Sequence, residues 1–264
     1  MCLILFAHKV HPHYPLVLAA NRDESYARAT APAAFWNDYP NVYGGRDLEQ
    51  GGTWLGITRG GEIAAVTNFR GGTAAGDAPR SRGELVANYL RGNSQRPAEY
   101  LARVSRDAAS YNGFNLILGD LDELCYLSNR GGKMTVIAPG VHGLSNHLLN
   151  TSWPKVDHGR KVMAELLHAK TQVLIDGLLD LLAERTVAPD DVLPDTGVGL
   201  PRERVLSPAF ITSPTYGTRS STVILVDNHG QVVFIERSFG ERGKLGRTAT
   251  GRFALEMAPT PAAV

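Results

Sequence analysis

Two short apolar runs at the start of the chain, joined by a polar turn, limit the possible folds more than any other feature. Cys2 stands directly before the first run, residues 3–7, and the second run, residues 15–20, ends just before Arg22 and Asp23. Runs of this length, rich in branched side chains and separated by a proline-containing connection, predict a β-hairpin. In an antiparallel pair the end of the second strand lies beside the start of the first. We therefore expect Arg22 and Asp23 to lie near Cys2.

The position of Cys2 next to the initiator methionine has chemical consequences. Met1 is normally removed when the next side chain is as small as cysteine, and its removal would leave one residue with both a thiol and a free α-amine. A thiol has a pKa near ~8.5 and an α-amine near ~7.7–8, so the amine can accept the thiol proton close to neutral pH. A guanidinium such as that of Arg22 favours the thiolate, and a carboxylate such as that of Asp23 orients the ammonium. The alternative is that Cys2 is a small, buried apolar residue of a first strand.

The composition excludes several classes of protein. The chain has 264 residues, of which 43% are hydrophobic and 20% charged, as is typical of a globular protein with a substantial core. Its formal net charge of +1 gives no long-range attraction to nucleic acid or to an anionic membrane. No apolar run approaches the ~20 residues of a transmembrane helix, and no secretory signal is visible. Cys2 and Cys125 are too few for a disulfide framework, so we expect a cytoplasmic protein.

Apolar periodicity predicts hairpins and helices in separate blocks. The strands predicted after the first hairpin cover residues 53–58, 62–67, 114–119, 123–128, 133–138, 221–227 and 231–237. The predicted helices cover two segments within residues 81–110, then residues 155–169 and 172–185. Residues 26–43 and 187–214 are expected to be irregular, the first with a short strand near residues 34–36, and the tail from about residue 241 to be loosely held. This grouping predicts one α+β domain over residues 1–264, with helices packed on antiparallel sheets.

Several short motifs, taken in order along the chain, resemble those of one protein family. The motifs are Met1-Cys2, Asn21-Arg22-Asp23-Glu24, Gly51-Gly52-Thr53-Trp54-Leu55-Gly56, Val66-Thr67-Asn68-Phe69-Arg70, Ser81-Arg82-Gly83-Glu84-Leu85, Tyr111-Asn112-Gly113-Phe114-Asn115-Leu116, Gly143-Leu144-Ser145-Asn146 and Trp153-Pro154-Lys155. Together they resemble the NRDE family, also called the Transport and Golgi organisation protein 2 family. The similarity covers nearly the whole chain.

The resemblance implies a fold and an activity. The family is similar in its N-terminal layout to cysteine N-terminal nucleophile hydrolases such as penicillin V acylase and bile salt hydrolase, whose fold is a four-layer αββα sandwich. The implied activity is hydrolysis of a linear, non-peptide amide or acyl bond, with Cys2 as the nucleophile. Arg22 and Asp23 would then position its thiolate and its amine. We expect no metal and no other cofactor in this reaction.

Three further residues are candidates for the same site through this resemblance. Asn68 and Asn146 match the positions at which those hydrolases place oxyanion-hole asparagines, and Arg219 matches a late arginine close to the thiolate. In the hydrolases the second asparagine is followed closely by proline, whereas here Pro154 is eight residues beyond Asn146. Alternatively, each asparagine caps a turn at a strand end, and Arg219 is a solvated residue that precedes an apolar strand.

The family also suggests a different function for the same cavity. Its eukaryotic members are associated with haem trafficking and with lipid or acyl-CoA homeostasis, so the cavity could bind haem or a lipid-like ligand without catalysis. His8, His11 and His13 are possible ligands, but they lie in a predicted turn and lack the spacing of a zinc site. Cys2 could in principle serve as an axial thiolate. A third possibility, a Golgi or secretory scaffold, depends on the family name alone.

Overall fold

The chain folds into two antiparallel β-sheets that face each other. The computed structural model describes residues 2–71, 79–92 and 95–256. Sheet A has the strand order β10-β1-β2-β11-β12-β13, with the bounds Gly140–Leu144, Cys2–His8, Leu16–Ser25, Tyr216–Val226, Gln231–Phe239 and Leu245–Ala254. Sheet B has the order β3-β4-β5-β6-β7-β8-β9, with the bounds Thr30–Phe35, Val42–Asp47, Leu55–Thr58, Ile63–Asn68, Phe114–Gly119, Leu124–Ser128 and Thr135–Val136. Most neighbouring strands are also neighbours in the sequence, so local hairpins build both sheets.

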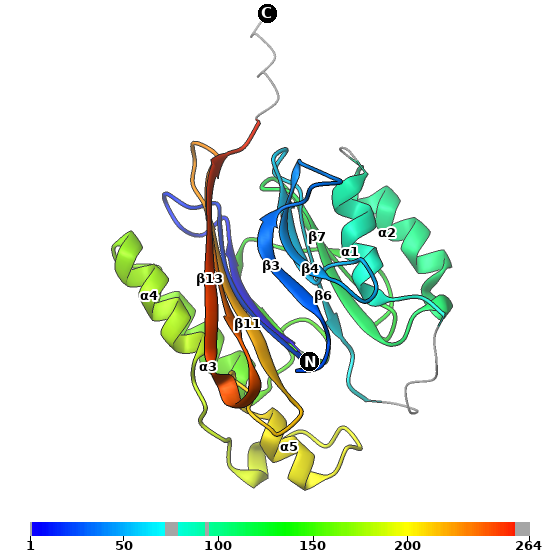
Figure 1. The fold of residues 1–264 in the computed structure, drawn as a ribbon, viewed down its shortest axis with the longest axis vertical. Helices are drawn as coiled ribbons and strands as arrows, with labels where there is room; N and C mark the ends of the chain where they lie inside the picture. Colours follow the sequence, from blue (N-terminus) through cyan, green and yellow to red (C-terminus); the bar gives the residue numbers. More distant parts are fainter. Residues whose placement is uncertain (1, 72–78, 93–94, 257–264) are drawn as a thin grey trace, which may run out of the picture.

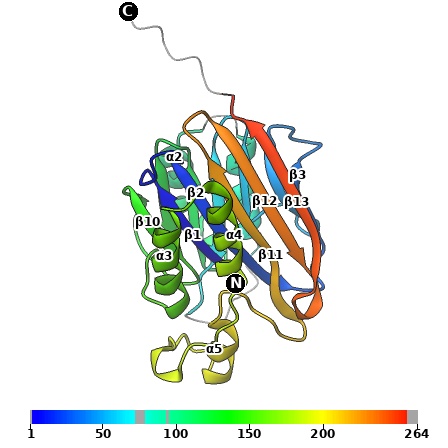
Figure 2. The same ribbon diagram turned by 90° about the vertical axis from the view of Figure 1, so that its left-hand side faces the viewer.

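Helices cover the outer face of each sheet. The α-helices are α1 (Arg82–Arg91), α2 (Pro97–Arg106), α3 (Pro154–Leu166), α4 (Thr171–Leu182) and α5 (Leu200–Leu206), and the short 3-10 helices are η1 (Ala108–Ser110), η2 (Asp190–Val192) and η3 (Glu241–Gly243). Helices α1 and α2 pack on sheet B, and α3 and α4 pack on sheet A (Figure 1). Figure 2 shows α3 and α4 lying over β1, β2 and their neighbours, with α5 at one end of the sandwich. The structure therefore confirms the four-layer αββα arrangement.

Three apolar cores hold these layers together. Successive side chains of a strand point to opposite faces, so Ile4 and Phe6 of β1 enter the core between the sheets, whereas Leu3 and Leu5 pack beneath the helices. A third core lies between sheet B and the α1–α2 pair. Burial on both faces explains why β1 and the first half of β2 are apolar at nearly every position. Each buried aliphatic side chain of this kind contributes roughly 1.5–3 kcal/mol.

Several segments differ from the sequence prediction. Residues 26–43 are not one loop, because β3 and the start of β4 pair within them. Residues 187–214 include helix α5, and β10 forms where no strand was predicted. The prediction of a loose tail is wrong for residues 245–254, which pair with β12 as the edge strand β13. That strand is held by its backbone ladder more than by apolar side chains, so its periodicity is weak. Residues 257–264 lie outside the described part of the chain.

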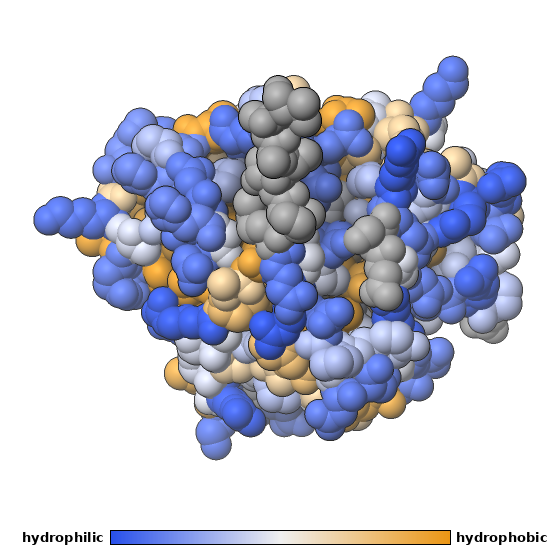
Figure 3. Space-filling view, turned by 90° about the horizontal axis from the view of Figure 1, so that it is seen from above, coloured by the Kyte–Doolittle hydropathy of each residue, from blue (hydrophilic) through white to orange (hydrophobic). Residues whose placement is uncertain are grey.

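Within the described ranges, no helix is both long and apolar enough to cross a bilayer, and the longest, α3, has 13 residues. The face seen in Figure 3 is mainly hydrophilic, with its hydrophobic residues in small separate areas.

A buried carboxylate joins the two sheets. Glu236 of β12 is 1% exposed, and its Oε1 accepts a hydrogen bond from the backbone N–H of Ala33 in β3 at 2.7 Å. Thr222 Oγ1 donates to its Oε2 at 3.5 Å. Burial raises the pKa of Glu236 to about 7, and the charge of Arg22 opposes this shift. Glu236 should therefore make the stability of the fold depend on pH.

We predict that Glu236→Gln stabilises the protein more at pH 8 than at pH 5. A carboxyl group whose pKa is higher in the folded than in the unfolded protein stabilises the fold while it is protonated, and this stabilisation is lost as pH rises through its folded-state pKa. The isosteric amide of glutamine does not titrate, so it has no such loss. From the ordinary pKa of 4.5 and the folded value of about 7, the difference between variant and wild type should grow by about 2–3 kcal/mol. Urea unfolding at both pH values measures it, with the exposed Glu241→Gln as control. An equal difference at the two pH values would contradict the assignment.

Candidate functional site

Cys2 and Arg22 are paired residues at the end of the first hairpin. The register of β1 and β2 places Cys2 opposite Arg22, as the sequence pattern predicts. Cys2 has the same strand parity as Ile4 and Phe6, so its thiol points to the space between the sheets, and Arg22 points to the same side. The guanidinium of Arg22 is 6% exposed and stacks on the ring of Trp54, which directly precedes β5, 4.4 Å from its centroid. The hairpin thus brings a thiol and a fixed cation together.

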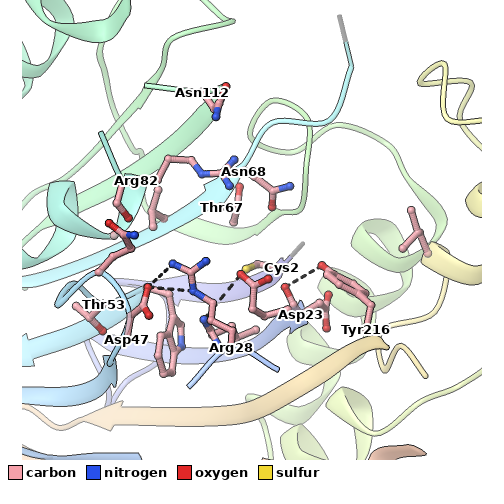
Figure 4. Close-up of a pocket in the computed structure, with 18 of the residues that line it drawn as sticks. Cys2, Asp23, Arg28, Asp47, Thr53, Thr67, Asn68, Arg82, Asn112 and Tyr216 are labelled. Atoms are coloured by element: carbon pink, nitrogen blue, oxygen red, sulfur yellow. Dashed lines mark hydrogen bonds and ion pairs between the residues drawn. The ribbon is translucent and has the colours of Figure 1, made fainter. Parts of the chain in front are cut away.

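These residues line a cavity of about 850 Å³ at the end of the sandwich near α5. Its walls come from β1, β2, β6, the start of α1, α5 and the segment before β11. Figure 4 shows Cys2, Asp23 and Tyr216 on one side, with Asn68 and Arg82 across from them. This volume lies within the usual range of about 300–1,000 Å³ for small-molecule sites. The cavity is therefore large enough for a ligand that reaches Cys2.

The environment of Cys2 sets the properties of its thiol. Burial raises the pKa of this thiol, and the Asp23 carboxylate acts in the same direction. The positive charge of Arg22 and a hydrogen bond from the Asp23 backbone N–H act in the opposite direction. Burial has the larger effect and the pKa of the thiol is raised, so a local base is needed to accept the thiol proton.

Asp23 is held rigidly on the other side of β2. It is 2% exposed, and its Oδ1 accepts a hydrogen bond from Thr218 Oγ1 at 2.7 Å. The hydroxyl of Tyr216 donates to its backbone oxygen at 2.8 Å. Burial raises the pKa of Asp23, while the charge of Lys155 favours the carboxylate. Strand β2 continues to Ser25 rather than turning, so Arg22 and Asp23 reach the cavity from opposite faces of the same strand.

A chain of hydrogen bonds connects the Cys2 backbone to Asn68. Ser145 Oγ donates to the Cys2 carbonyl oxygen at 3.1 Å and to Asn146 Oδ1 at 3.3 Å. Asn146 Nδ2 in turn donates to the backbone oxygen and to Oδ1 of Asn68, at 2.9 and 3.0 Å. Asn146 is fully buried, and both of its amide hydrogens are used in this way. Asn68 lines the cavity, and the structure places Asn146 behind it as a support rather than in the cavity wall.

Arg219 lies away from the thiol. Its Nη1 donates to the backbone oxygens of Ser25, Tyr26 and Arg28 at 2.7, 3.1 and 3.0 Å. Its Nε donates to Phe239 at 3.3 Å, and it is not among the residues that line the cavity. The hypothesis that Arg219 lies close to the thiolate is therefore wrong. Its guanidinium instead binds backbone oxygens at the end of β2 and in the segment that follows it.

Lys155 is a site residue that the sequence did not reveal. It lies in the first turn of α3, is 7% exposed, and donates from Nζ to the backbone oxygen of Leu206 at 2.9 Å. Burial lowers its pKa to about 8, and the nearby charge of Asp23 opposes that shift. The motif Trp153-Pro154-Lys155 contained it, but nothing in the spacing indicated that a helix would carry its amine towards Asp23.

A buried ion pair fixes α5 at the edge of the cavity. Arg70 Nη1 lies 3.2 Å from Glu203 Oε2, and the two side chains are 6% and 3% exposed. Arg70 also stacks on Trp153, 4.5 Å from the ring centroid, and Thr196 Oγ1 donates to Glu203 Oε1 at 2.5 Å. Removing one partner of such a pair typically costs about 3–5 kcal/mol. This anchoring holds the cavity-lining residues of α5 in place.

Within the described residues, no group of three or more His, Cys, Asp or Glu side chains is arranged to hold a metal ion. His8 is buried, with its Nε2 3.3 Å from the backbone oxygen of Leu121, while His11 and His13 contact each other in the turn between β1 and β2.

The fold and the site together define a class of protein. It is a four-layer αββα protein in which Cys2 starts an interior strand and lines a cavity. The chain belongs to the Transport and Golgi organisation 2 family, whose sequence model matches residues 1–241.

Individual relatives match over nearly their full length. The chain is 39% identical over 277 residues to the Transport and Golgi organization protein 2 homolog of Bos taurus, covering 97% of this chain and 100% of that protein. It is 40% identical to the Homo sapiens homolog, covering 92% and 94%. The Drosophila melanogaster Transport and Golgi organization protein 2 is 32% identical, covering 90% and 92%.

Two solved structures were also matched. A Caenorhabditis elegans ortholog of N-acylethanolamine-hydrolyzing acid amidase has a TM-score of 0.46 and 14% identity, covering 85% of this chain and 92% of that one. A mutant of the conjugated bile acid hydrolase from Clostridium perfringens has a TM-score of 0.44 and 10% identity, covering all of both chains.

We predict that Cys2 is alkylated and that Cys125 is inert. Cys2 lines the cavity, whereas Cys125 is 0% exposed and burial raises its pKa to about 12. Iodoacetamide at pH 8 should modify Cys2 more than about tenfold faster, because a buried thiol reacts from locally opened states. Peptide mass spectrometry after timed quenching measures both rates, and labelling in urea checks that each peptide is detectable. Faster modification of Cys125 would refute the assignment.

We also predict that Asp23→Asn changes Cys2 more than Glu24→Gln does. The Asp23 carboxylate is buried and its charge raises the pKa of the Cys2 thiol, so its removal should shift the alkylation profile to lower pH. Glu24 is 32% exposed at its side chain and lies 3.9 Å from Arg22, where water screens it. The shift in Asp23→Asn should be at least about twice that in Glu24→Gln. Alkylation rates measured from pH 6 to 10 decide this, and a larger shift in Glu24→Gln would show that Glu24 is the carboxylate that acts on the thiol.

Proposed function

We propose that this protein is an N-terminal cysteine nucleophile hydrolase that cleaves linear, non-peptide amide or acyl bonds. The observation that carries the proposal is the pairing of Cys2 with Arg22 at a cavity whose opposite wall presents Asn68. Acyl transfer requires a nucleophile, a group that favours its ionised form, and a hydrogen-bond donor for the oxyanion. These three groups come from β1, β2 and β6, which are rigid elements.

The first half of the reaction forms a thioester. Once Met1 has been removed, the α-amine of Cys2 takes the thiol proton, and Arg22 stabilises the thiolate. The buried carboxylate of Asp23 holds the resulting ammonium. The thiolate attacks the substrate carbonyl carbon, and the oxyanion accepts a hydrogen bond from Asn68 Nδ2. Asn146 keeps this amide in position by binding its Oδ1.

The second half releases both products. The carbon–nitrogen bond breaks as the leaving amine takes the proton from the α-ammonium, which leaves Cys2 as a thioester. Water then gives a proton to the α-amine and attacks the thioester carbon. The carbon–sulfur bond breaks, the leaving sulfur takes the proton back from the α-ammonium, and the carboxylic acid and the thiol result.

We predict that Cys2→Ala abolishes turnover while preserving the fold. A panel of linear amides, esters and thioesters of different acyl lengths should contain at least one substrate of the processed wild type. Loss of the nucleophile should lower its turnover by more than about 10³-fold, because the other groups of the site cannot form the thioester. Cys125→Ala, which changes the other cysteine, is the matched control and should retain turnover.

The same proteins test the carrier function. Haemin and acyl-CoA titrations are carried out on wild type and Cys2→Ala, and circular dichroism checks that both are folded. If wild type turns over no member of the panel, and both forms bind haemin or acyl-CoA stoichiometrically, the hydrolase proposal falls and the cavity is that of a carrier.

A further inference from the structure

The charges that line the cavity are not balanced. Among the described residues, five arginines contribute to its walls: Arg22, Arg28, Arg80, Arg82 and Arg202. Three acids of the same part of the chain contribute: Asp23, Glu24 and Asp47. The excess of cations is notable because the whole chain has a formal net charge of +1.

Three of these arginines have carboxylate partners. Arg28 Nη2 lies 2.5 Å from Asp47 Oδ2, and Arg22 lies 3.9 Å from Glu24. Arg80 pairs with Glu84 at 2.5 Å, outside the cavity wall. Within the described part of the chain, neither Arg82 nor Arg202 has a carboxylate within 4.0 Å. The surplus charge therefore lies at the first residue of α1 and on α5.

Arg82 is the more deeply placed of these two residues. Arg202 is exposed on α5, whereas Arg82 is half-buried and burial lowers its pKa. Its Nη1 donates to the backbone oxygen of Gly113 at 3.2 Å, which uses one of five guanidinium hydrogens. A guanidinium stays charged at any ordinary pH, so an unpaired one in a partly desolvated site favours an anionic partner.

The backbone that carries Arg82 is fixed. Arg82 is the first residue of α1, and the next residue, Gly83, packs directly on Gly52: a Cβ atom on Gly52 would lie 2.6 Å from the Gly83 carbonyl carbon. Thr53 N donates to the Gly83 oxygen at 3.2 Å. This close approach sets where the Arg82 side chain enters the cavity. Figure 4 shows that it extends beside Asn68, across the cavity from Cys2.

We propose that Arg82 forms a carboxylate subsite of the cavity, so that the substrate carries an anionic group close to its scissile carbonyl. The planar fork of the guanidinium matches the two oxygens of a carboxylate, and Arg202 at the rim adds attraction on approach. The inference about the substrate rests on the proposed hydrolase function, but the subsite itself does not. A carboxylate-bearing reagent that reacts with Cys2 reports the subsite without turnover.

The test compares two alkylating reagents that differ in charge. Iodoacetate and iodoacetamide have the same reacting carbon, so the ratio of their rates at Cys2 measures the attraction of a carboxylate. Arg82→Gln should lower this ratio about fivefold, since a unit charge several ångströms away acts through a partly aqueous site. Arg82→Lys keeps the charge and should retain most of the ratio. Arg106→Gln, on the exposed end of α2, is the control for net charge and should leave it unchanged.

The outcomes are distinct. An unchanged ratio in Arg82→Gln, or an equal fall in both rates, would overturn the subsite. For the substrate, kcat/KM in wild type should be higher for N-octanoylglycine than for its glycinamide analogue. In Arg82→Gln the two values should become similar. Failure of both amides to react, with a fivefold change in the alkylation ratio, would retain the subsite and refute hydrolysis of this class. Equal kcat/KM values for the two amides in wild type would refute the anionic substrate.

Discussion

Strand β1 pairs with β2 along its whole length, and the register of this pairing decides what faces the cavity. A shift by one residue would turn the Cys2 thiol from the space between the sheets to the helical side, because the side-chain period of a strand is two. The same register sets Arg22 opposite Cys2 and exposes the Cys2 backbone to Ser145. Both faces of the hairpin are buried in apolar cores, so a slip would disrupt two layers at once.

The remainder of the site depends on how sheet B is held against this hairpin. Ser145 and Asn146, which follow β10, connect the Cys2 carbonyl to Asn68 of β6. The stacking of Arg22 on Trp54 forms a second contact, between β2 and the segment that leads into β5 of sheet B. Hydrogen bonds within a buried network position their members more strictly than isolated contacts do. The two walls of the cavity are therefore held in a defined relation, as a preorganised site requires.

The hairpin could be predicted because its apolar runs, its turn and its polar ends all lie within a short stretch of sequence. The resemblance predicted Asn68 as a site residue. That Asn146 lies behind Asn68 and supports it depends on packing between segments 78 residues apart in the sequence. Arg219 matched a sequence position, yet the course of the chain after β2 surrounds it with backbone oxygens. Lys155 and Arg82 gave no periodic signal, because each is placed by the contact of a helix with a distant sheet. Strand β13 was missed because an edge strand needs few apolar residues.

The central claim is that Cys2 acts with its own α-amine, and this requires a free N-terminus on Cys2. The intact mass of the purified protein, expressed without an N-terminal tag, measures this directly. The account predicts a single main species that lacks Met1, with Cys2 as the first residue in N-terminal sequencing. Retention of Met1 in most molecules would contradict it, because the amine would then belong to a different residue and the thiol would have no local base.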